Sequence, residues 1–367
     1  MKLRYKIASG FLIFTGVAVF TLAIIIGRTS ACEPAPAVDH ETELMKAMVS
    51  RCYGSPDVLA LEEIAKPAPA NGEVLVKVAA AAVNPLDWHY MRGSPFLMRL
   101  GTGLGAPADA SMGVDFAGTV EAVGSDVTRF KPGDEVFGGR SGAFAEYVVV
   151  GEDGAIALKP GNMTFQQAAA VPIAAITALQ ALRDKGKLQP GQKVLINGAS
   201  GGVGTFAVQI AKSFGAEVTG VCSTRNVEMV LSIGADHVFD YKKEDYTESG
   251  NQYDLIIDMV GNHSLSANRR ALNPDGTFVI VGGGKGNWLG PMMTPIKALF
   301  LSPFVDQEFV MILAEITPDD LAILGDLMRA GTVTPVIDSR YALSELKAAI
   351  QHSEEGHTRG KIIIEVQ

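Results

Sequence analysis

The sequence has few cysteines, no excess of positive charge and no internal repeat. Its 3 cysteines cannot build a disulfide framework, and no two of them have the spacing of metal ligands. The basic residues number 31 against 40 acidic ones, which gives a net charge of −9. This balance is ordinary for a soluble enzyme and argues against nucleic acid as a partner, because phosphate backbones bind basic surfaces. The length of 367 residues suggests two domains.

Charge is also missing from residues 7–27, IASGFLIFTGVAVFTLAIIIG, which follow three basic residues near the N-terminus. About 20 apolar residues span a bilayer as a helix, whereas the apolar region of a signal peptide has about 7–15. We therefore favour one uncleaved N-terminal transmembrane helix over a cleaved signal peptide, with the rest of residues 1–46 containing a linker. The positive charge before the segment exceeds that of Arg28 after it, which favours a cytoplasmic N-terminus.

After the linker, the sequence pattern changes to one that is typical of short strands and turns. Strands are predicted within 74–84, 113–124, 131–138 and 143–150. They indicate a mainly β domain of the partly closed barrel kind over residues 47–172. The chain ends in GKIIIEV, a strand that can rejoin this domain, so we assign residues 310–367 to it as well.

Residues 173–309 alternate between apolar strands and helices. The strands VLING, AEVTGVCS, HVFDY, YDLIIDMVG and TFVIVGGG have nearly continuous apolar runs. Such strands, separated by helices, are typical of a parallel sheet that is covered on both faces. The sequence therefore predicts an α/β protein with a doubly wound second domain.

A glycine-rich stretch, INGASGGVGTF (196–206), joins the first of these strands to a helix. Ala199, Gly201 and Gly204 occupy the three positions of the dinucleotide-binding fingerprint, with alanine in place of the first glycine. Gly201 lets the backbone approach a pyrophosphate, and Gly204 lets the helix pack closely on the strand. The helix N-terminus supplies free amides and partial positive charge. The strand–loop–helix context makes this a strong signal for a dinucleotide.

The end of the second strand indicates which dinucleotide is bound. An acidic residue there would bind the ribose hydroxyls of NAD, but the chain has Ser223, Thr224 and Arg225. Hydroxyls and a guanidinium are suited to the 2′-phosphate of NADPH. The alternative is an exposed polar turn without function.

Several longer segments carry a resemblance to a known family. They include VNPLDWHYMRG (83–93), GVDFAGTVEAVG (113–124), LQPGQKVLINGASGGVGTFAVQIAK (188–212) and GHTRGKI (356–362). The chain resembles the medium-chain dehydrogenase/reductases, and within them the zinc-independent quinone oxidoreductase branch that includes zeta-crystallin and the reticulon-interacting mitochondrial oxidoreductases. The resemblance implies a GroES-like catalytic domain folded around an inserted Rossmann domain that binds NADP.

The resemblance also implies a set of site residues. It places Ser200, Gly202 and Val203 at the pyrophosphate, beside Gly201 and Gly204, and it places Ser223 and Arg225 at the 2′-phosphate, beside Thr224. Tyr241 is expected near the adenosine, and His357, Thr358 and Arg359 are expected to close over the cofactor. Asn84 matches an asparagine near the nicotinamide. Asp87 and Tyr90 follow it and are candidates to assist orientation, although their spacing singles out neither.

The zinc-dependent relatives have ligands that this chain lacks. They have a cysteine at the position of Asn84, a histidine–glutamate pair at Val114 and Asp115, and a four-cysteine lobe that is absent here. Valine cannot bind zinc, and without a Lewis acid the oxidation of an alcohol loses its main means of lowering the pKa of the hydroxyl. Reduction of a polarised acceptor needs mostly hydride positioning. We therefore expect no zinc, and NADPH-dependent reduction of a quinone or an α,β-unsaturated carbonyl.

Three questions stay open at this point. The protein could instead be an NADPH-binding redox sensor or interaction protein with little turnover. The apolar tract 288–304, WLGPMMTPIKALFLSPF, fits either core or oligomer packing, for example in a homodimer, or the wall of a site for a greasy substrate. The side of the membrane is also open, because NADPH is found inside the cell whereas the charge bias places the catalytic domain outside.

Overall fold

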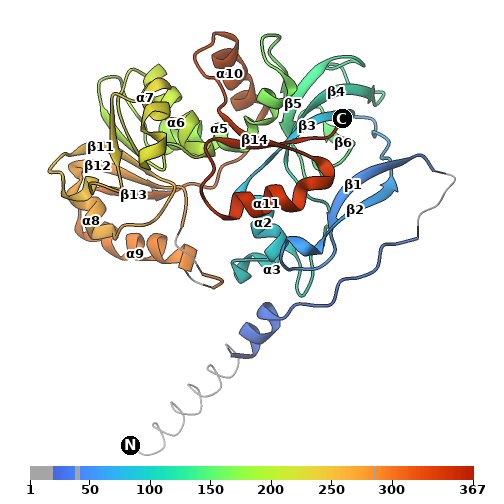
Figure 1. The fold of residues 1–367 in the computed structure, drawn as a ribbon, viewed down its shortest axis with the longest axis horizontal. Coiled ribbons are helices and arrows are strands. Elements are labelled where there is room, and N and C mark those ends of the chain that lie inside the picture. The colour runs from blue at the N-terminus through green and yellow to red at the C-terminus, as the bar shows by residue number, and fades with distance from the viewer. Residues whose placement is uncertain (1–19, 38–41, 284–285, 289) are drawn as a thin grey trace, which may run out of the picture.

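The computed structural model describes residues 20–37, 42–283, 286–288 and 290–367. A six-stranded and a seven-stranded sheet occupy separate halves of the molecule, and a two-stranded hairpin, β1 (Leu44–Ser50) and β2 (Leu59–Ala65), lies beside the second sheet (Figure 1). The α/β class, the GroES-like sheet and the Rossmann-like sheet are therefore confirmed.

The six-stranded sheet has the order β10–β9–β8–β11–β12–β13, and all its strand pairs are parallel. Its strands are β8 (Lys193–Asn197), β9 (Glu217–Cys222), β10 (His237–Asp240), β11 (Tyr253–Asp258), β12 (Leu272–Ile280) and β13 (Glu308–Met311). The chain order reverses between β8 and β11, the point at which doubly wound sheets bind their ligands.

Helices cover both faces of this sheet, as the nearly continuous apolar strands predict. Val194 and Ile196 of β8 belong to one core cluster and Leu195, which points to the other face, belongs to a second. The helices are α5 (Pro172–Gln180), α6 (Gly202–Ser213), α7 (Val227–Ser232), α8 (Leu265–Arg270) and α9 (Met293–Leu301). Burial on both faces explains why these strands lack the polar–apolar alternation of a half-exposed sheet.

The seven-stranded sheet has the order β14–β15–β3–β4–β5–β7, with β6 paired to β3. Its strands are β3 (Glu73–Val83), β4 (Asp115–Val123), β5 (Glu135–Gly139), β6 (Tyr147–Gly151), β7 (Ile156–Leu158), β14 (Ile337–Ala342) and β15 (Lys361–Glu365). The helices of this half are α2 (Pro85–Arg92), α3 (Arg99–Thr102), α4 (Phe165–Ala169), α10 (Pro318–Arg329) and α11 (Leu346–Glu354).

The C-terminal strand returns to the first domain, as its apolar sequence predicts. β15 pairs antiparallel with β3, with Ile362 opposite Val83. The predicted domain boundaries themselves stay a prediction. The boundary before residue 47 falls inside β1, and the boundary after residue 309 falls inside β13.

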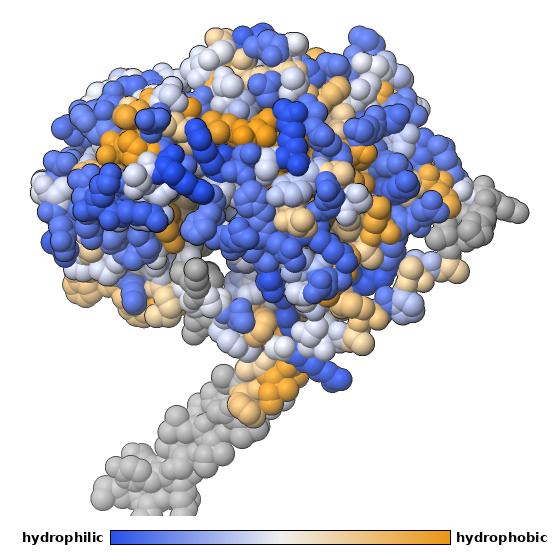
Figure 2. All heavy atoms as spheres, viewed as in Figure 1, coloured by the Kyte–Doolittle hydropathy of each residue, from blue (hydrophilic) through white to orange (hydrophobic). Residues whose placement is uncertain are grey.

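The described part of the predicted anchor is short. Residues 7–19 lie outside the described residues, and residues 20–27 are helical. Phe20, Leu22 and Ile24 are exposed on this helix, which forms an apolar projection from the body in Figure 2. No helix found in residues 20–37, 42–283, 286–288 and 290–367 combines the length and the apolar content that crossing a bilayer requires.

The end of this helix is attached to the catalytic half by hydrogen bonds and a disulfide. The buried guanidinium of Arg99 donates from Nη1 to the carbonyl oxygens of Ile26 and Arg28, at 3.2 and 3.0 Å. A disulfide joins Cys32 to Cys52 with the Cα atoms 4.7 Å apart. The sequence analysis did not predict this pair, because one bond between two distant cysteines has no spacing signature.

Within the apolar tract 288–304, Met293–Leu301 form α9, which lies on the outside of the six-stranded sheet. Leu299 and Phe300 each have 73 % of their surface exposed, so these two side chains do not pack in the core of the chain. Trp288 packs its ring against Phe96, with the ring centroids 5.0 Å apart. The predicted homodimer stays a prediction.

Candidate functional site

The glycine-rich loop lies between β8 and the N-terminus of α6, as predicted. A Cβ at Gly204 would lie 2.1 Å from the carbonyl oxygen of Gly198, so only glycine permits this close packing of helix on strand. Gly202 is the first residue of α6, and Gly201 is its N-cap. No cap from a side chain satisfies the first turn, so its backbone N–H groups remain available to an anion such as a pyrophosphate. The loop therefore fits a dinucleotide.

The three residues after β9 have different surroundings. The hydroxyl of Thr224 donates to Asp240 Oδ2 at 2.6 Å, and this bond lowers the pKa of the Asp240 carboxyl. The proton of the Thr224 hydroxyl is therefore already used in a hydrogen bond within the protein. Ser223 Oγ accepts a weaker bond from Asn226, at 3.3 Å. Arg225 donates from Nη2 to the backbone oxygen of His357.

Asn226 is a site residue that the sequence analysis missed. Its side-chain nitrogen donates to Ser200 Oγ at 3.0 Å and so joins the glycine-rich loop to the end of β9. The residue is 4 % exposed, and its Oδ1 has no hydrogen-bond partner among the described residues. A buried acceptor without a partner is costly, and a hydroxyl of a bound nucleotide would satisfy it.

The C-terminal loop lies against the glycine-rich loop. The N–H of Gly360 donates to the Ser200 carbonyl at 2.9 Å, and Gly201 forms a bridge with Gly360. A Cβ at Gly360 would lie 2.2 Å from the carbonyl oxygen of Val336, and its φ of +87° also favours glycine. The predicted residues His357, Thr358 and Arg359 directly precede this contact. They stay predicted cofactor ligands, as does Tyr241, which is 51 % exposed.

On the catalytic side, Asn84 lies in a buried network. It is the N-cap of α2 and is 2 % exposed. Its Nδ2 donates to Asp115 Oδ2 at 2.9 Å and to the Ala82 carbonyl at 3.3 Å. Its Oδ1 accepts a hydrogen bond from Lys361 Nζ at 2.5 Å. Both amide protons are thus bound by protein acceptors, which fixes the orientation of the side chain.

Asp87 completes the first turn of α2. Its Oδ2 accepts the backbone N–H of Asn84 at 2.7 Å, which forms a capping box. The pKa of Asp87 is raised from about 3.8 to about 7, mainly by burial; the Asn84 N–H and Lys361 oppose the shift, and the nearby Asp115 adds to it. Burial also raises the pKa of Asp115, against the attraction of Lys361. Tyr90, the third predicted residue, is 43 % exposed and has no hydrogen bond to this network.

Lys361 is the second site residue that the sequence analysis did not single out. It is the first residue of β15, is 3 % exposed, and has Nζ 3.3 Å from Asp115 Oδ2. The only sequence signal is a lysine that opens an apolar terminal strand, within the segment GHTRGKI.

No group of three potential metal-binding His, Cys, Asp or Glu side chains occurs in the described part of the chain. The expectation that the protein lacks zinc rests on the residues at positions 84 and 114 and stays a prediction.

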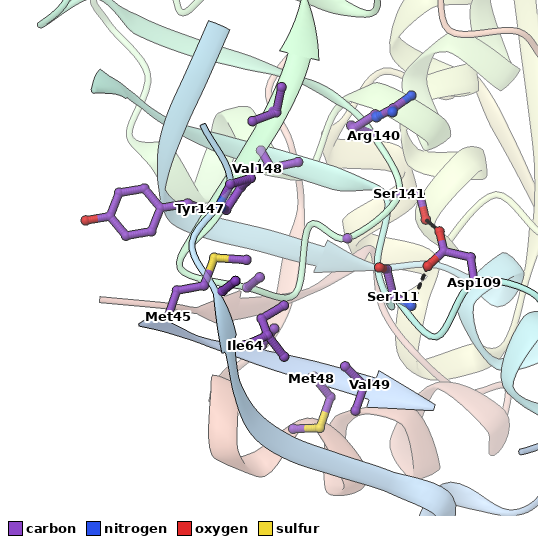
Figure 3. A pocket seen from close by; sticks show the side chains of 16 residues that line it. Met45, Met48, Val49, Ile64, Asp109, Ser111, Arg140, Ser141, Tyr147 and Val148 are labelled. Atoms are coloured by element: carbon purple, nitrogen blue, oxygen red, sulfur yellow. Dashed lines mark hydrogen bonds between the residues drawn. The ribbon is translucent and has the colours of Figure 1, made fainter. Parts of the chain in front are cut away.

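A separate cavity of about 310 Å³ lies between the β1–β2 hairpin and β6 (Figure 3). Its walls include Met45, Ile64 and Val148. Asp109, at one end, accepts hydrogen bonds from the Ser111 N–H and the Ser141 hydroxyl. None of the predicted site residues lines this cavity, so we assign it no role in the reaction.

Comparison with known proteins agrees with this geometry. Residues 70–160 match the alcohol dehydrogenase GroES-like domain, and residues 233–364 match the zinc-binding dehydrogenase family. The chloroplastic quinone-oxidoreductase QR1 of Triphysaria versicolor is 35 % identical over 341 residues, which cover 88 % of this chain and 99 % of that protein. This chain is a quinone oxidoreductase-like medium-chain dehydrogenase/reductase. It is therefore an NAD(P)H-dependent oxidoreductase.

Other relatives and solved structures support the same family. The mitochondrial NAD(P)H oxidoreductase RTN4IP1 of Bos taurus is 32 % identical, over 88 % of this chain and 89 % of that protein. The quinone oxidoreductase of Coxiella burnetii has a TM-score of 0.79 at 32 % identity, over 89 % of this chain and all (100 %) of that one. The Escherichia coli quinone oxidoreductase, solved in complex with NADPH, has a TM-score of 0.75 at 25 % identity, over 88 % and 100 %.

Proposed function

We propose that this medium-chain dehydrogenase/reductase uses NADPH, without zinc, to reduce a quinone or an α,β-unsaturated carbonyl. One observation carries the cofactor preference: Arg225, at the end of β9, is held against the His357 backbone where the C-terminal loop meets the glycine-rich loop. A guanidinium at the end of the second strand suits a 2′-phosphate.

Each segment of the candidate site has a part in this proposal. The first turn of α6 binds the pyrophosphate, and Ser223 and Arg225 bind the 2′-phosphate. The bound cofactor supplies a hydride. Thr224 is not needed, because its hydroxyl is bound to Asp240. The Asn84 network forms the catalytic side of the site.

Cofactor affinities test the preference. NADPH should bind more tightly than NADH, and Arg225→Ala should weaken NADPH about ten- to hundredfold, the value of one charge-assisted contact. NADH affinity should stay nearly unchanged. Arg329→Ala, which removes an exposed arginine paired with Asp326 on α10, is the matched control. Equal affinity of the unmutated protein for both cofactors would contradict the proposal.

A panel of quinones, enals and enones, followed by NADPH absorbance, tests the reaction class. Turnover of at least one of these acceptors is expected. Tight NADPH binding with no oxidation across the panel would favour the alternative of a redox-sensing or interaction protein with little turnover. Elemental analysis of the active protein should find no stoichiometric zinc, and one tightly held zinc per chain would overturn that part of the proposal.

We also propose that residues 7–27 anchor the protein in a membrane, as their uncharged sequence predicts. The full chain should sediment with membranes and resist alkaline extraction. Phe14→Arg, which places a charge inside the segment, should move it toward the supernatant. Recovery of the unmutated full chain in the high-speed supernatant would contradict the anchor.

The disulfide supports one side of that membrane. The Cys32–Cys52 bond lies directly after the apolar segment, and disulfides persist in oxidising compartments. The positive-inside bias points to the same, non-cytoplasmic side, whereas the cellular location of NADPH points to the cytoplasm. Protease added to intact cells should cleave the catalytic domain. Full protection, with cleavage only after lysis, would place it in the cytoplasm.

A further inference from the structure

A buried ammonium group lies between the catalytic sheet and the glycine-rich loop and is not accounted for by the proposed cofactor contacts. The side chain of Lys361 is 3 % exposed. Its Nζ donates to Asn84 Oδ1 at 2.5 Å and lies 3.3 Å from Asp115 Oδ2. Asn84 Nδ2 in turn donates to the same Asp115 oxygen. The three side chains form a closed triangle of hydrogen bonds.

Lys361 also touches the cofactor half of the molecule. A Cβ at Gly202 would lie 3.1 Å from Lys361 Cδ, so the lysine stem runs against the first residue of α6. The preceding residue, Gly360, is bridged to Gly201. Lys361 therefore lies where the catalytic sheet, the glycine-rich loop and the N-terminus of α2 meet.

One donor of this ammonium is unused. An ammonium group has three N–H donors, and Asn84 and Asp115 accept from two of them. No other acceptor for Nζ occurs in the described residues. Desolvation of a charge is repaid only when its remaining donors are satisfied, so the oxygen of a ligand beside Nζ would complete the arrangement.

Asn84 and Asp115 accept the two hydrogen bonds that hold the Lys361 ammonium in place. We propose that Lys361 is a catalytic residue, whose free N–H binds the oxygen of the acceptor as negative charge develops on it. This inference rests on the proposed reduction of a carbonyl or quinone.

The charge balance of the step is simple. The acceptor takes up the hydride with its electron pair and forms one new C–H or O–H bond, while the π electrons move to the carbonyl oxygen. Water then supplies a proton to complete the two-electron reduction. Lys361 keeps its own proton and stabilises the oxyanion, in the way that a preorganised donor does in a water-poor site.

The test separates this role from a structural ion pair. Lys361→Met alone leaves the Asp115 carboxylate buried without a partner, so the main variant is K361M/D115N, which removes both charges. The amide that replaces the carboxylate keeps an oxygen for the Ile173 N–H, which Asp115 Oδ1 now accepts at 3.0 Å. The matched control is K159M/E135Q. It removes a similar ion pair, with Nζ and Oε2 2.9 Å apart and the lysine side chain 4 % exposed.

The first readouts are the thermal midpoint, NADPH affinity, kcat and KM. K361M/D115N should unfold within about 5 °C of the unmutated protein and bind NADPH within about threefold, but its kcat should fall about 10²–10³-fold, as for loss of one oxyanion donor. K361R keeps the charge and should lose less than tenfold. If the kcat of K361M/D115N stays within threefold of the unmutated value, Lys361 and Asp115 form only a structural ion pair. A loss confined to NADPH affinity would show cofactor anchoring. Either result overturns the proposal.

A second readout needs no turnover. 4-Nitrophenol, whose anion absorbs visible light, serves as an oxyanion probe in the NADP-loaded protein. The unmutated protein and K159M/E135Q should bind the phenolate in preference to the phenol, and K361M/D115N should bind the phenolate at least tenfold more weakly. Equal phenolate binding by all variants would overturn the proposal. If the protein reduces no acceptor but shows this loss, the proposed reaction fails while the anion-binding role of Lys361 stands.

Discussion

Asp87→Asn should change how stability depends on pH. Asp87 is 2 % exposed, and burial raises its pKa from about 3.8 to about 7. The folded protein therefore holds a proton on Asp87 between these values, whereas the unfolded chain releases it. Because the folded state binds more protons in this window, its stability falls as pH rises from about 4 to about 7.

The size of the effect follows from the shift. One pKa unit corresponds to 1.36 kcal/mol, so a shift of about three units removes about 4 kcal/mol of stability by pH 8. Asn cannot ionise, and its side-chain oxygen can still accept the backbone N–H of Asn84. The variant should therefore match the unmutated protein below about pH 4, exceed its stability by about 1 kcal/mol at pH 4.5, and exceed it by about 4 kcal/mol at pH 8.

Urea unfolding at several pH values between 4.5 and 8 measures the difference. Trp88, the next residue on α2, provides a fluorescent probe beside the change. Asp275→Asn, at an exposed position of β12, controls for loss of one carboxylate. Stability curves of the Asp87 variant and the unmutated protein that run parallel over the whole range would refute the reasoning, because they would show that the carboxyl does not hold its proton in the folded state.

Two further changes test the loop and the disulfide. Gly204→Ala should lower stability by about 1–3 kcal/mol and weaken NADPH binding at least tenfold, because its Cβ would meet the Gly198 oxygen. Gly161→Ala, which has open space around it, is the control and should change neither stability nor NADPH affinity. Thermal unfolding and cofactor titration measure the two effects. After denaturation without reductant, a thiol reagent should detect one free cysteine. Cys52→Ser should lower the free energy of unfolding by about 3 kcal/mol, the loop entropy of a bond to Cys32 across 20 residues. A count of three thiols would rule out the bond.

The features predicted correctly are those with a local signature. The strand predicted at VLING (194–198), which is observed as β8 at Lys193–Asn197, the glycine-rich turn and α6 follow one another in the chain. Each obeys a rule about neighbours in sequence. The return of the C-terminal strand to the seven-stranded sheet was also predictable, because an apolar strand at the chain end needs a partner that buries it. The same rules could not settle where α9 packs, since an apolar helix can face a core or a partner surface.

The parts of the site that were missed depend on distant pairs. Lys361 and Asn84 are separated by 277 positions, and no periodicity links them. Lysine at the start of a strand is usually a solvated end residue, so its burial becomes visible only when β15 lies beside β3. Asn226 was passed over for a similar reason, because it lies outside the fingerprint and acts by joining Ser200 to Ser223.

The assignment of NADPH shows why residue types alone are not sufficient at a cofactor site. By type, Ser223, Thr224 and Arg225 are equal candidates for a 2′-phosphate. The structure separates them, because the Thr224 hydroxyl is committed to Asp240, a carboxylate at the end of the next strand that would itself repel a phosphate. Lys243 Nζ lies 3.1 Å from that carboxylate and offsets its charge. The proposed preference for NADPH therefore depends on Arg225 and on the C-terminal loop that holds it, and not on the hydroxyl-rich character of the turn.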